Sequence, residues 1–204
     1  MIALIDYRAG NLTSVRKALA FIGAEVRTPL TPEDLADAAG IIVPGVGNFG
    51  ATAALDEPWR RAVRQAVAER RPLLGICLGL QWLFEGSEEA ATLSGLGVLP
   101  GRCVRLGEKG DSPLFRLKVP HVGWNSLDLR GSSRLLEGVV SGTQAYFTHS
   151  FVAPPSTATV ALTTHGEPFP SVVERDLVFG VQFHPEKSAD AGLRILRNFM
   201  AMCL

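Results

Sequence analysis

The residues with the clearest chemical potential are Cys77 and a histidine motif near the C-terminus. Cys77 stands in the apolar run of residues 72–81, and His184-Pro185-Glu186 follows much later in the chain. A thiol with an ordinary pKa of roughly 8.5 is only partly ionised at neutral pH, so a reactive cysteine needs an imidazole to accept its proton. His184 can supply this base, and the Glu186 carboxylate can orient the imidazole. The three residue types together predict nucleophilic catalysis by a thiolate.

The pattern around Cys77 favours the same prediction. A β-like segment ends just before Cys77 and a helical pattern follows, which predicts a tight turn at the carboxyl edge of a sheet with a helix N-terminus beside the thiol. Taken alone, a cysteine in an apolar run is more often a small core residue. The flanking Gly75 and Gly79 favour catalysis, because glycines allow a sharp turn and the close approach of a substrate. The proline after His184 predicts extended backbone, so Glu186 should lie on the same side of the strand end.

The elements that must position these residues alternate between β-like and helical patterns in the first half of the chain. Strands are expected at residues 2–5, 25–28, 41–43 and 72–76. Helices are expected after Asn11, which we interpret as an N-cap, and at residues 31–34, 59–67 and 78–84. This alternation predicts an α/β fold with a mostly parallel, doubly wound sheet and flanking helices.

From about Gly95 the pattern changes to β-like segments, which predicts extra antiparallel strands in the C-terminal half. These segments cover residues 101–106, 115–119, 126–129, 144–152, 157–163, 171–174 and 178–183. Residues 174–177 fit a hairpin turn that leads into the strand before His184. Apolar residues from Leu193 to Cys203 recur at helical spacing and predict a closing helix. No repeat or linker is evident, so we expect residues 1–204 to form a single domain.

Composition limits the functions that this domain can have. The chain has 204 residues, 47% of them hydrophobic, and its 20 basic and 20 acidic residues give a formal net charge of zero. No global field therefore attracts nucleic acid or an anionic membrane. Neither a signal peptide nor an apolar run of roughly 20 residues is evident. The three cysteines are irregularly spaced, which disfavours a disulfide framework and a zinc site. We expect a cytoplasmic protein without a metal or other cofactor.

A glycine-rich turn, Pro44-Gly45-Val46-Gly47, follows the strand expected at residues 41–43. Acyl transfer needs hydrogen-bond donors for the oxyanion of the tetrahedral intermediate, and glycines allow backbone N–H groups to turn toward a ligand. An ordinary strand-to-helix turn fits these residues equally well. A phosphate-binding loop is disfavoured, because the lysine and hydroxyl residue of a Walker motif are absent.

Several motifs occur together and in order. They are Pro44-Gly-Val-Gly-Asn-Phe-Gly50, Gly75-Ile-Cys-Leu-Gly-Leu-Gln81, Pro120-His-Val-Gly-Trp-Asn125, Tyr146-Phe-Thr-His-Ser-Phe151 and Gln182-Phe-His-Pro-Glu-Lys187. With them the chain resembles the class I, or triad, glutamine amidotransferases, whose cysteine attacks the side-chain amide of glutamine and releases ammonia. Within that family it is similar to the branch of glutaminase subunits of imidazole glycerol phosphate synthase. A glutaminase of another pathway and a catalytically silent regulatory module are the alternatives.

The resemblance implies a role for each matching residue. Cys77 would be the nucleophile, His184 the general base and then acid, and Glu186 the residue that orients the imidazole. The N–H groups of Val46 and Leu78 would form the oxyanion hole. The residues implied around glutamine are Gly47, Gln81, Glu89, His149, Ser150 and Phe151.

Some of these assignments have plainer alternatives. Gln81 lies one helical turn after Cys77, so the two side chains can share a face. Glu89 also fits a solvated acidic run, and His149 and Ser150 also fit the polar end of a strand. Phe151 would contribute only its backbone and packing.

The resemblance also implies a partner, a (β/α)8-barrel cyclase subunit that would use the ammonia within a heterodimer. The interface residues that it implies are Asn11, Trp124 and Lys187, although Lys187 also fits a simple surface charge. The segment of residues 6–11 departs from the family's usual Asp-Tyr-Gly-x-Gly-Asn by carrying Arg8.

Four further residues are expected to have structural roles. We expect His121 to be a structural or interface residue, His165 to lie in an exposed turn, and Cys103 and Cys203 to be core thiols.

Overall fold

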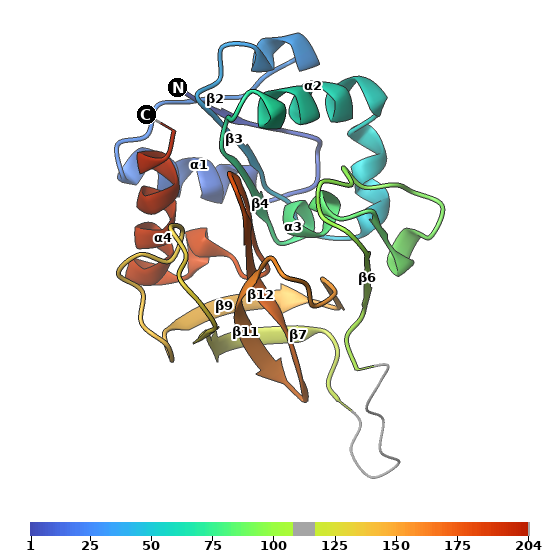
Figure 1. Cartoon of the computed structure of the whole chain (residues 1–204), viewed down its shortest axis with the longest axis vertical. Coiled ribbons are helices and arrows are strands. Elements are labelled where there is room, and N and C mark those ends of the chain that lie inside the picture. The colour runs from blue at the N-terminus through green and yellow to red at the C-terminus, as the bar shows by residue number, and fades with distance from the viewer. Residues whose placement is uncertain (108–116, 204) are drawn as a thin grey trace.

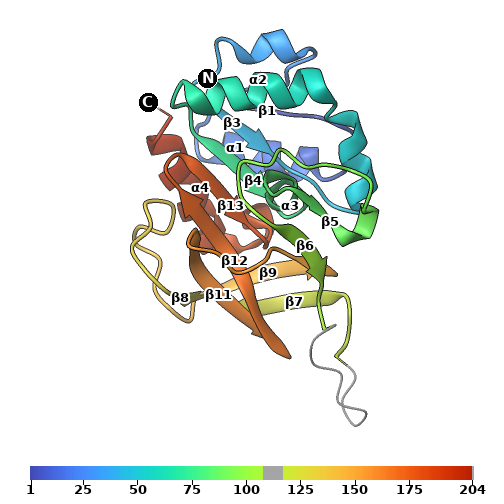
Figure 2. The same cartoon turned by 45° about the vertical axis from the view of Figure 1, so that its right-hand side comes forward.

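The structure is a computed structural model that describes residues 1–107 and 117–203. Its centre is an eight-stranded sheet with the strand order β2-β1-β3-β4-β13-β12-β11-β8. Figure 1 labels β2, and Figure 2 labels the other strands of this sheet. The strands of its parallel half are β1 (Ile2–Leu4), β2 (Val26–Arg27), β3 (Gly40–Val43), β4 (Leu73–Ile76) and β13 (Val178–Val181). Except at β2, these strands are buried on both faces, as their unbroken apolar runs predict.

The register of the parallel half brings distant parts of the chain to one edge. Strand β4 pairs with β3 on one side and with β13 on the other, and Ile76 lies opposite Val181. The residues that directly follow β4 and β13 therefore leave the sheet side by side at its carboxyl edge. This edge is where ligands bind in open α/β sheets.

The remaining strands of the large sheet are antiparallel. They are β12 (Glu167–Arg175), β11 (Thr159–His165) and β8 (Asp128–Leu129). Strands β12 and β13 form the predicted hairpin, whose turn contains Asp176 with a φ of 54°. The predicted change from parallel to antiparallel pairing is confirmed, and it falls between β13 and β12.

Within the described residues, four α-helices cover the two faces of the sheet. They are α1 (Leu12–Phe21), α2 (Glu57–Ala68), α3 (Leu78–Leu83) and α4 (Ala189–Ala201). Helices α1 and α4 lie on one face, and α2 and α3 lie on the other, which can be followed in Figures 1 and 2. The short 3-10 helices are Pro32–Leu35, Phe49–Ala54, Glu88–Ala90 and Pro185–Lys187.

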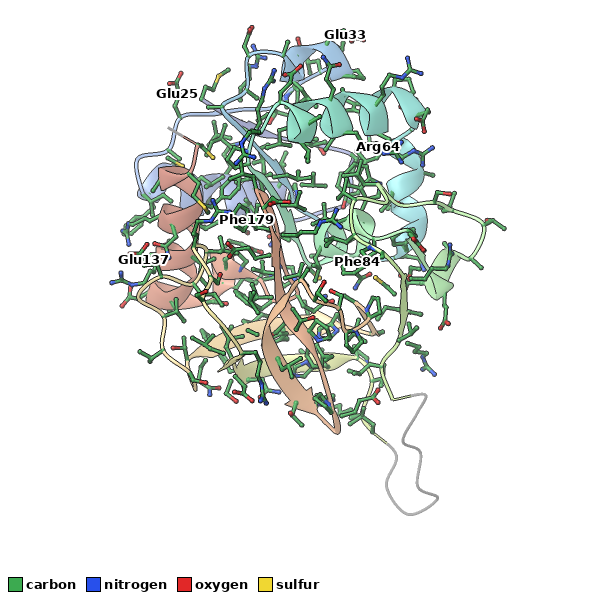
Figure 3. The ribbon with its side chains drawn as sticks, viewed as in Figure 1. Glu25, Glu33, Arg64, Phe84, Glu137 and Phe179 are labelled. Carbon is green, nitrogen blue, oxygen red and sulfur yellow. The ribbon has the colours of Figure 1, made fainter. Side chains whose placement is uncertain are left out.

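Successive side chains of the central strands point to opposite faces of the sheet and pack into two separate hydrophobic cores. Ile42 and Leu74 pack toward α1 and α4, whereas their neighbours Ile41 and Leu73 pack toward α2 and α3. Phe179, which is labelled in Figure 3, belongs to the core on the side of α1 and α4, and its ring is 6.1 Å from that of Phe199 of α4. This double burial fixes the register of β4, because a slip of one residue would exchange the two faces.

In the part of the chain that the structure describes, two small sheets extend the carboxyl edge. One pairs β7 (His121–Ser126) with β9 (Gln144–His149), and the other has the order β10-β6-β5, with β10 (Phe151–Val152), β6 (Arg102–Arg105) and β5 (Gly86–Ser87). The strand expected at residues 144–152 is therefore two strands that meet at Ser150 and join different sheets. The strand expected at residues 126–129 is also divided, because its first residue ends β7. The strand expected at residues 115–119 lies partly outside the described residues, and residues 117–119 are not in a strand.

Candidate active site

Cys77 makes the turn between β4 and α3. Its φ of 52° and ψ of −103° place a non-glycine residue in a sparsely populated backbone region, as in other strained nucleophile turns. The turn is held by the Cys77 N–H, which donates to the Val181 carbonyl at 2.8 Å, and by the Cys77 carbonyl, which accepts from the Gln81 N–H at 3.2 Å. The predicted tight turn is confirmed, and the strain lies on the cysteine itself.

The glycines that flank Cys77 have a packing role. Neither Gly75 nor Gly79 has a positive φ, so neither makes the sharp turn. A Cβ on Gly75 would stand 2.5 Å from the Gly79 carbonyl oxygen, and a Cβ on Gly79 would stand 1.8 Å from the Val43 carbonyl oxygen. The glycines therefore allow helix α3 to lie directly against the sheet. They allow the sharp turn at Cys77 through this close packing, and not through a positive φ of their own.

His184 and Glu186 form a buried pair beside Cys77. The His184 Nδ1 lies 2.7 Å from the Glu186 Oε1, and both side chains are almost wholly buried. Because the carboxylate accepts, the imidazole donates through Nδ1, and Nε2 can face the thiol. Burial lowers the pKa of His184, but hydrogen bonding and charge interactions with Cys77 and Glu186 outweigh it and raise this pKa to about 9. The contacts with Cys77 and Glu186 therefore favour the protonated form of the imidazole.

Asn11 contacts the same carboxylate. It occupies the N-cap position of α1 with a φ of 59°, but its side chain makes no capping hydrogen bond. Instead its Nδ2 donates to the Glu186 Oε1. The prediction that Asn11 is the N-cap residue is confirmed, but its side chain contacts Glu186 and does not cap the helix. Asn11 and His184 together hold the Glu186 carboxylate in place.

The two N–H groups expected to form an oxyanion hole both have backbone partners. The Val46 N–H donates to the Ala9 carbonyl at 2.8 Å, and the Leu78 N–H donates to the Gly45 carbonyl at 3.3 Å. The Gly45 carbonyl and the Val46 N–H belong to one peptide group. Rotation of this single peptide would therefore release both donors.

A cavity of about 250 Å3 opens beside the thiol. Its wall contains Cys77, Leu78, Pro120, Thr148 and the six residues expected around glutamine, Gly47, Gln81, Glu89, His149, Ser150 and Phe151. These six residues come from the segments after β3 and β4, from the 3-10 helix Glu88–Ala90, and from the junction of β9 and β10. The structure thus brings together all of the predicted pocket residues.

Two pocket side chains are fixed by internal hydrogen bonds. The Gln81 Nε2 donates to the Phe151 carbonyl at 2.9 Å, and the Glu89 Oε2 accepts from the Phe49 N–H at 2.7 Å. Gln81 therefore keeps its side-chain oxygen for a ligand, and Glu89 keeps one carboxylate oxygen. Both groups are acceptors, which suits a ligand that carries an ammonium group.

Besides His184, the imidazoles of His121 and His149 are buried, and their hydrogen bonds define where each carries its proton. The Asn125 Nδ2 donates to the Thr164 carbonyl at 2.9 Å and lies 3.2 Å from the His121 Nε2, which must therefore accept. The His121 Nδ1 then donates to the His149 Nε2 at 3.1 Å, and the His149 Nδ1 donates to the Phe151 carbonyl at 3.1 Å. Both imidazoles are neutral in this chain.

The pKa values of the two imidazoles agree with this pattern. Burial, together with the neighbouring imidazole His165, lowers the pKa of His121 to about 4. Burial and the other imidazoles lower the pKa of His149 to about 3. His121 has the structural role expected of it. His165 is not in the turn itself but ends β11, and its ring stacks on that of His121 at 4.2 Å between centroids.

Three side chains expected at a partner interface lie toward the same edge of the molecule. Trp124 is 54% exposed on β7, and its ring packs against that of Tyr146 with 6.1 Å between centroids. The Lys187 Nζ lies 5.7 Å from the centroid of the same Tyr146 ring. Val122 is also exposed on β7. Asn11 is half-buried against Glu186.

Sequence reasoning missed two groups at the site. The Ala9 carbonyl accepts a hydrogen bond from the Val46 N–H. The contact joins two backbone groups, so the pattern of side chains in the sequence gives no sign of it. Gln182 is completely buried beside the Cys77 sulfur. A glutamine directly after the buried strand at residues 178–181 was a usable signal, because buried polar side chains need partners. Cys103 is a core thiol as expected, and Cys203 is half-buried.

Within residues 1–107 and 117–203, no group of three or more His, Cys, Asp or Glu side chains could hold a metal ion. In the same part of the chain, no helix has the length and apolar character to cross a bilayer.

Comparison with known proteins places this chain in a family. The model of the family "Glutamine amidotransferase class-I" matches residues 3–203. The chain belongs to this family.

Curated relatives narrow the comparison to one branch. The protein named imidazole glycerol phosphate synthase subunit HisH from Natronomonas pharaonis is 44% identical over 212 residues, which cover 100% of this chain and 95% of the relative. Proteins of the same name from Desulfitobacterium hafniense strain DCB-2 and Thermococcus kodakarensis are 46% and 45% identical. These two alignments each cover 98% of this chain and 93% and 98% of the respective relatives.

Solved structures agree with the fold. A structure described as a glutamine amidotransferase has a TM-score of 0.76 at 22% identity, covering 100% of this chain and 99% of that one. PurLQS from Thermotoga maritima has a TM-score of 0.75 at 18% identity, covering 98% and 97%. At these identities the likeness concerns the fold alone, and it confirms the predicted α/β class.

Proposed function

We propose that this chain is the glutaminase subunit of imidazole glycerol phosphate synthase. It hydrolyses glutamine to glutamate and ammonia, and it passes the ammonia to a cyclase subunit in histidine biosynthesis. The observation that carries the proposal is the position of Cys77, which is strained, paired with a buried imidazole and carboxylate, and set in the wall of a cavity that contains every predicted pocket residue. The HisH relatives support the choice of branch.

Glutamine binds with its side-chain amide against Cys77. The acceptors of Gln81 and Glu89 suit its ammonium group, and the Ser150 hydroxyl can donate to its carboxylate. The zero net charge of the chain makes this recognition local. His149 keeps the Phe151 carbonyl in place and so supports the orientation of Gln81.

In the first half-reaction, His184 takes the proton of the Cys77 thiol and the thiolate attacks the amide carbon. The carbonyl oxygen becomes an oxyanion. When the tetrahedral intermediate collapses, the C–N bond breaks, the imidazolium gives its proton to the leaving nitrogen, and ammonia departs. Cys77 is left as a thioester. Glu186 and Asn11 hold the imidazole in one orientation throughout.

In the second half-reaction, water replaces the amide nitrogen. His184 accepts a proton from the water as its oxygen attacks the thioester carbon. Collapse of the second intermediate breaks the C–S bond, and the proton returns to the sulfur or stays on the imidazole as an ion pair. Glutamate leaves the cavity.

The oxyanion donors must be released before either half-reaction is fast. We infer that rotation of the peptide between Gly45 and Val46 frees the N–H groups of Val46 and Leu78 together, because this one peptide holds both contacts. The Ala9 carbonyl belongs to the loop of residues 6–11, which also carries Asn11. A partner that moves this loop therefore acts on the oxyanion donors and the triad carboxylate together.

The proposed partner is a (β/α)8-barrel cyclase, bound as a heterodimer. The exposed apolar side chains of Val122 and Trp124, next to the Lys187 ammonium, give the docking surface both apolar area and a charge. We also propose that residues 1–204 act as a single amidotransferase domain. Three unpaired cysteines support a reducing, cytoplasmic location.

The proposal is tested by reconstitution with a barrel cyclase. Ammonia release from glutamine is measured for the chain alone, with the cyclase, and with the cyclase plus its imidazole carboxamide nucleotide. The expected result is a heterodimer on size exclusion and glutamine-dependent formation of imidazole glycerol phosphate. A stable heterodimer without glutaminase activity in any mixture would instead identify a silent regulatory module.

A further inference from the structure

A second polar side chain, besides His184, lies against the Cys77 sulfur. The Gln182 Nε2 is 3.7 Å from the Cys77 Sγ, and the whole of Gln182 is buried. Its backbone N–H is occupied by the Ser171 carbonyl at 2.9 Å. A fully buried side-chain amide is costly unless its groups are paired, so the partners of Gln182 define its role.

The orientation of the Gln182 amide follows from its neighbours. The Gln81 Nε2 donates to the Phe151 carbonyl, which can only accept, so the nitrogen of Gln81 is identified without ambiguity. The same nitrogen lies 3.4 Å from the Gln182 Oε1. The oxygen of Gln182 therefore faces Gln81, and its NH2 group faces the sulfur. The reverse orientation would set two NH2 groups against each other and a carbonyl oxygen against a thiolate.

The support for this orientation extends beyond Gln81. The Phe151 carbonyl also accepts from the neutral imidazole of His149, which limits movement of the acceptor that fixes Gln81. The sulfur itself lies 3.8 Å from the Thr148 carbonyl, to which a protonated thiol can donate. Once the thiol loses its proton, the Thr148 carbonyl cannot form a hydrogen bond with the sulfur, whereas the amide N–H of Gln182 can donate one to it.

We propose that Gln182 is a further catalytic residue, whose side-chain N–H donates to the Cys77 sulfur and stabilises the thiolate. The inference deepens the proposed function and rests on Cys77 being its nucleophile. The two neighbours of the sulfur act differently: His184 exchanges a proton with it, whereas the neutral amide does not titrate and is available at every pH. Gln81 is the positioning residue that keeps the amide turned toward the sulfur.

The test is the pH dependence of Cys77 alkylation by iodoacetamide, followed by peptide mapping, in the full chain. Replacement of Gln182 by methionine keeps the length of the side chain and removes the donor. In Gln182→Met, alkylation at pH 7 should slow roughly threefold to tenfold, the range that one hydrogen bond of ordinary strength provides. At high pH, where the whole population is ionised, the two rates should converge. The matched control is Gln144→Met, since Gln144 is exposed on β9.

An unchanged profile in a folded Gln182→Met chain would overturn the proposal, and so would an equal slowing at every pH, which would indicate altered access instead. If Gln182→Met does not fold, Gln182→Asn keeps an amide but withdraws it by one methylene, and the same slowing at pH 7 is expected. Alkylation does not depend on glutamine turnover. Loss of glutaminase activity under all conditions would therefore refute the proposed function and leave the role of Gln182 to be decided by the alkylation profile.

Discussion

The occupied oxyanion donors predict a chain that works slowly by itself and is strongly activated by its partner. The perturbation is the addition of the cyclase, first alone and then with its nucleotide ligand. In the structure, the Val46 N–H is bound to Ala9 and the Leu78 N–H to Gly45. Removing one oxyanion donor costs about 3 kcal/mol of transition-state stabilisation, or a factor of at least about 100 in rate.

The energetic cost of rotating the peptide between Gly45 and Val46 limits how far the partner can raise the rate. The rotation breaks two backbone hydrogen bonds that each contribute about 1 kcal/mol, so the net activation is smaller than the product of two full donors. We therefore expect at least about a hundredfold rise in kcat, with a smaller change in KM, because the oxyanion exists only in the transition state and intermediate. Glutamate formation at saturating glutamine measures it, with Cys77→Ala as the background. Equal rates in all three mixtures would refute the reasoning.

Two further predictions concern the thiols and the buried imidazoles. A glutamine-like electrophile should label Cys77 and spare the other two thiols. Burial raises the pKa of Cys203 to about 12 and raises that of Cys103 further, so neither forms a thiolate at neutral pH. Predominant labelling of Cys103 in a peptide map would contradict this. The pKa values of His121 and His149 are lowered in the folded chain, so below about pH 6.5 the unfolded chain binds more protons than the folded chain. The free energy of unfolding should therefore be highest above that pH and should fall as the pH drops toward about 4. Urea midpoints at several pH values test this, and a midpoint that does not fall with pH would count against buried neutral imidazoles.

The parallel half of the fold was predictable because each of its elements repeats a simple rule. Apolar runs mark strands buried on both faces, and the alternation with helices predicts a parallel sheet. The turn at Cys77 followed from the change of pattern at that residue. The positions of Cys77 and His184 at one edge then followed from the pairing of β4 with β13.

The glycines and Asn11 were harder, because one residue type serves several purposes. Gly75 and Gly79 could make a turn or allow close packing, and only the distance to neighbouring backbone separates the two roles. Asparagine is a common N-cap residue, so the sequence predicts a capping side chain at Asn11. In the structure Asn11 has a positive φ, and its amide contacts Glu186, which is far away in sequence. Such long-range contacts leave no periodic signal.

The short strands beyond the edge of the large sheet were also hard to predict. Strand β7 exposes Val122 and Trp124 and buries His121, which reverses the usual relation between polarity and burial. The change of sheet at Ser150 follows from tertiary pairing and not from local preference. That residues 1–204 form one domain stays a prediction.

The central claim is that this chain supplies ammonia and that another polypeptide uses it. The most direct measurement compares glutamine-dependent and ammonia-dependent formation of imidazole glycerol phosphate by the complex that carries Cys77→Ala, with assembly checked by size exclusion. We predict that the glutamine-dependent reaction is lost while the ammonia-dependent reaction stays close to that of the native complex, because only the nitrogen source is removed. Loss of both reactions in an assembled complex, or retention of the glutamine-dependent one, would contradict the account.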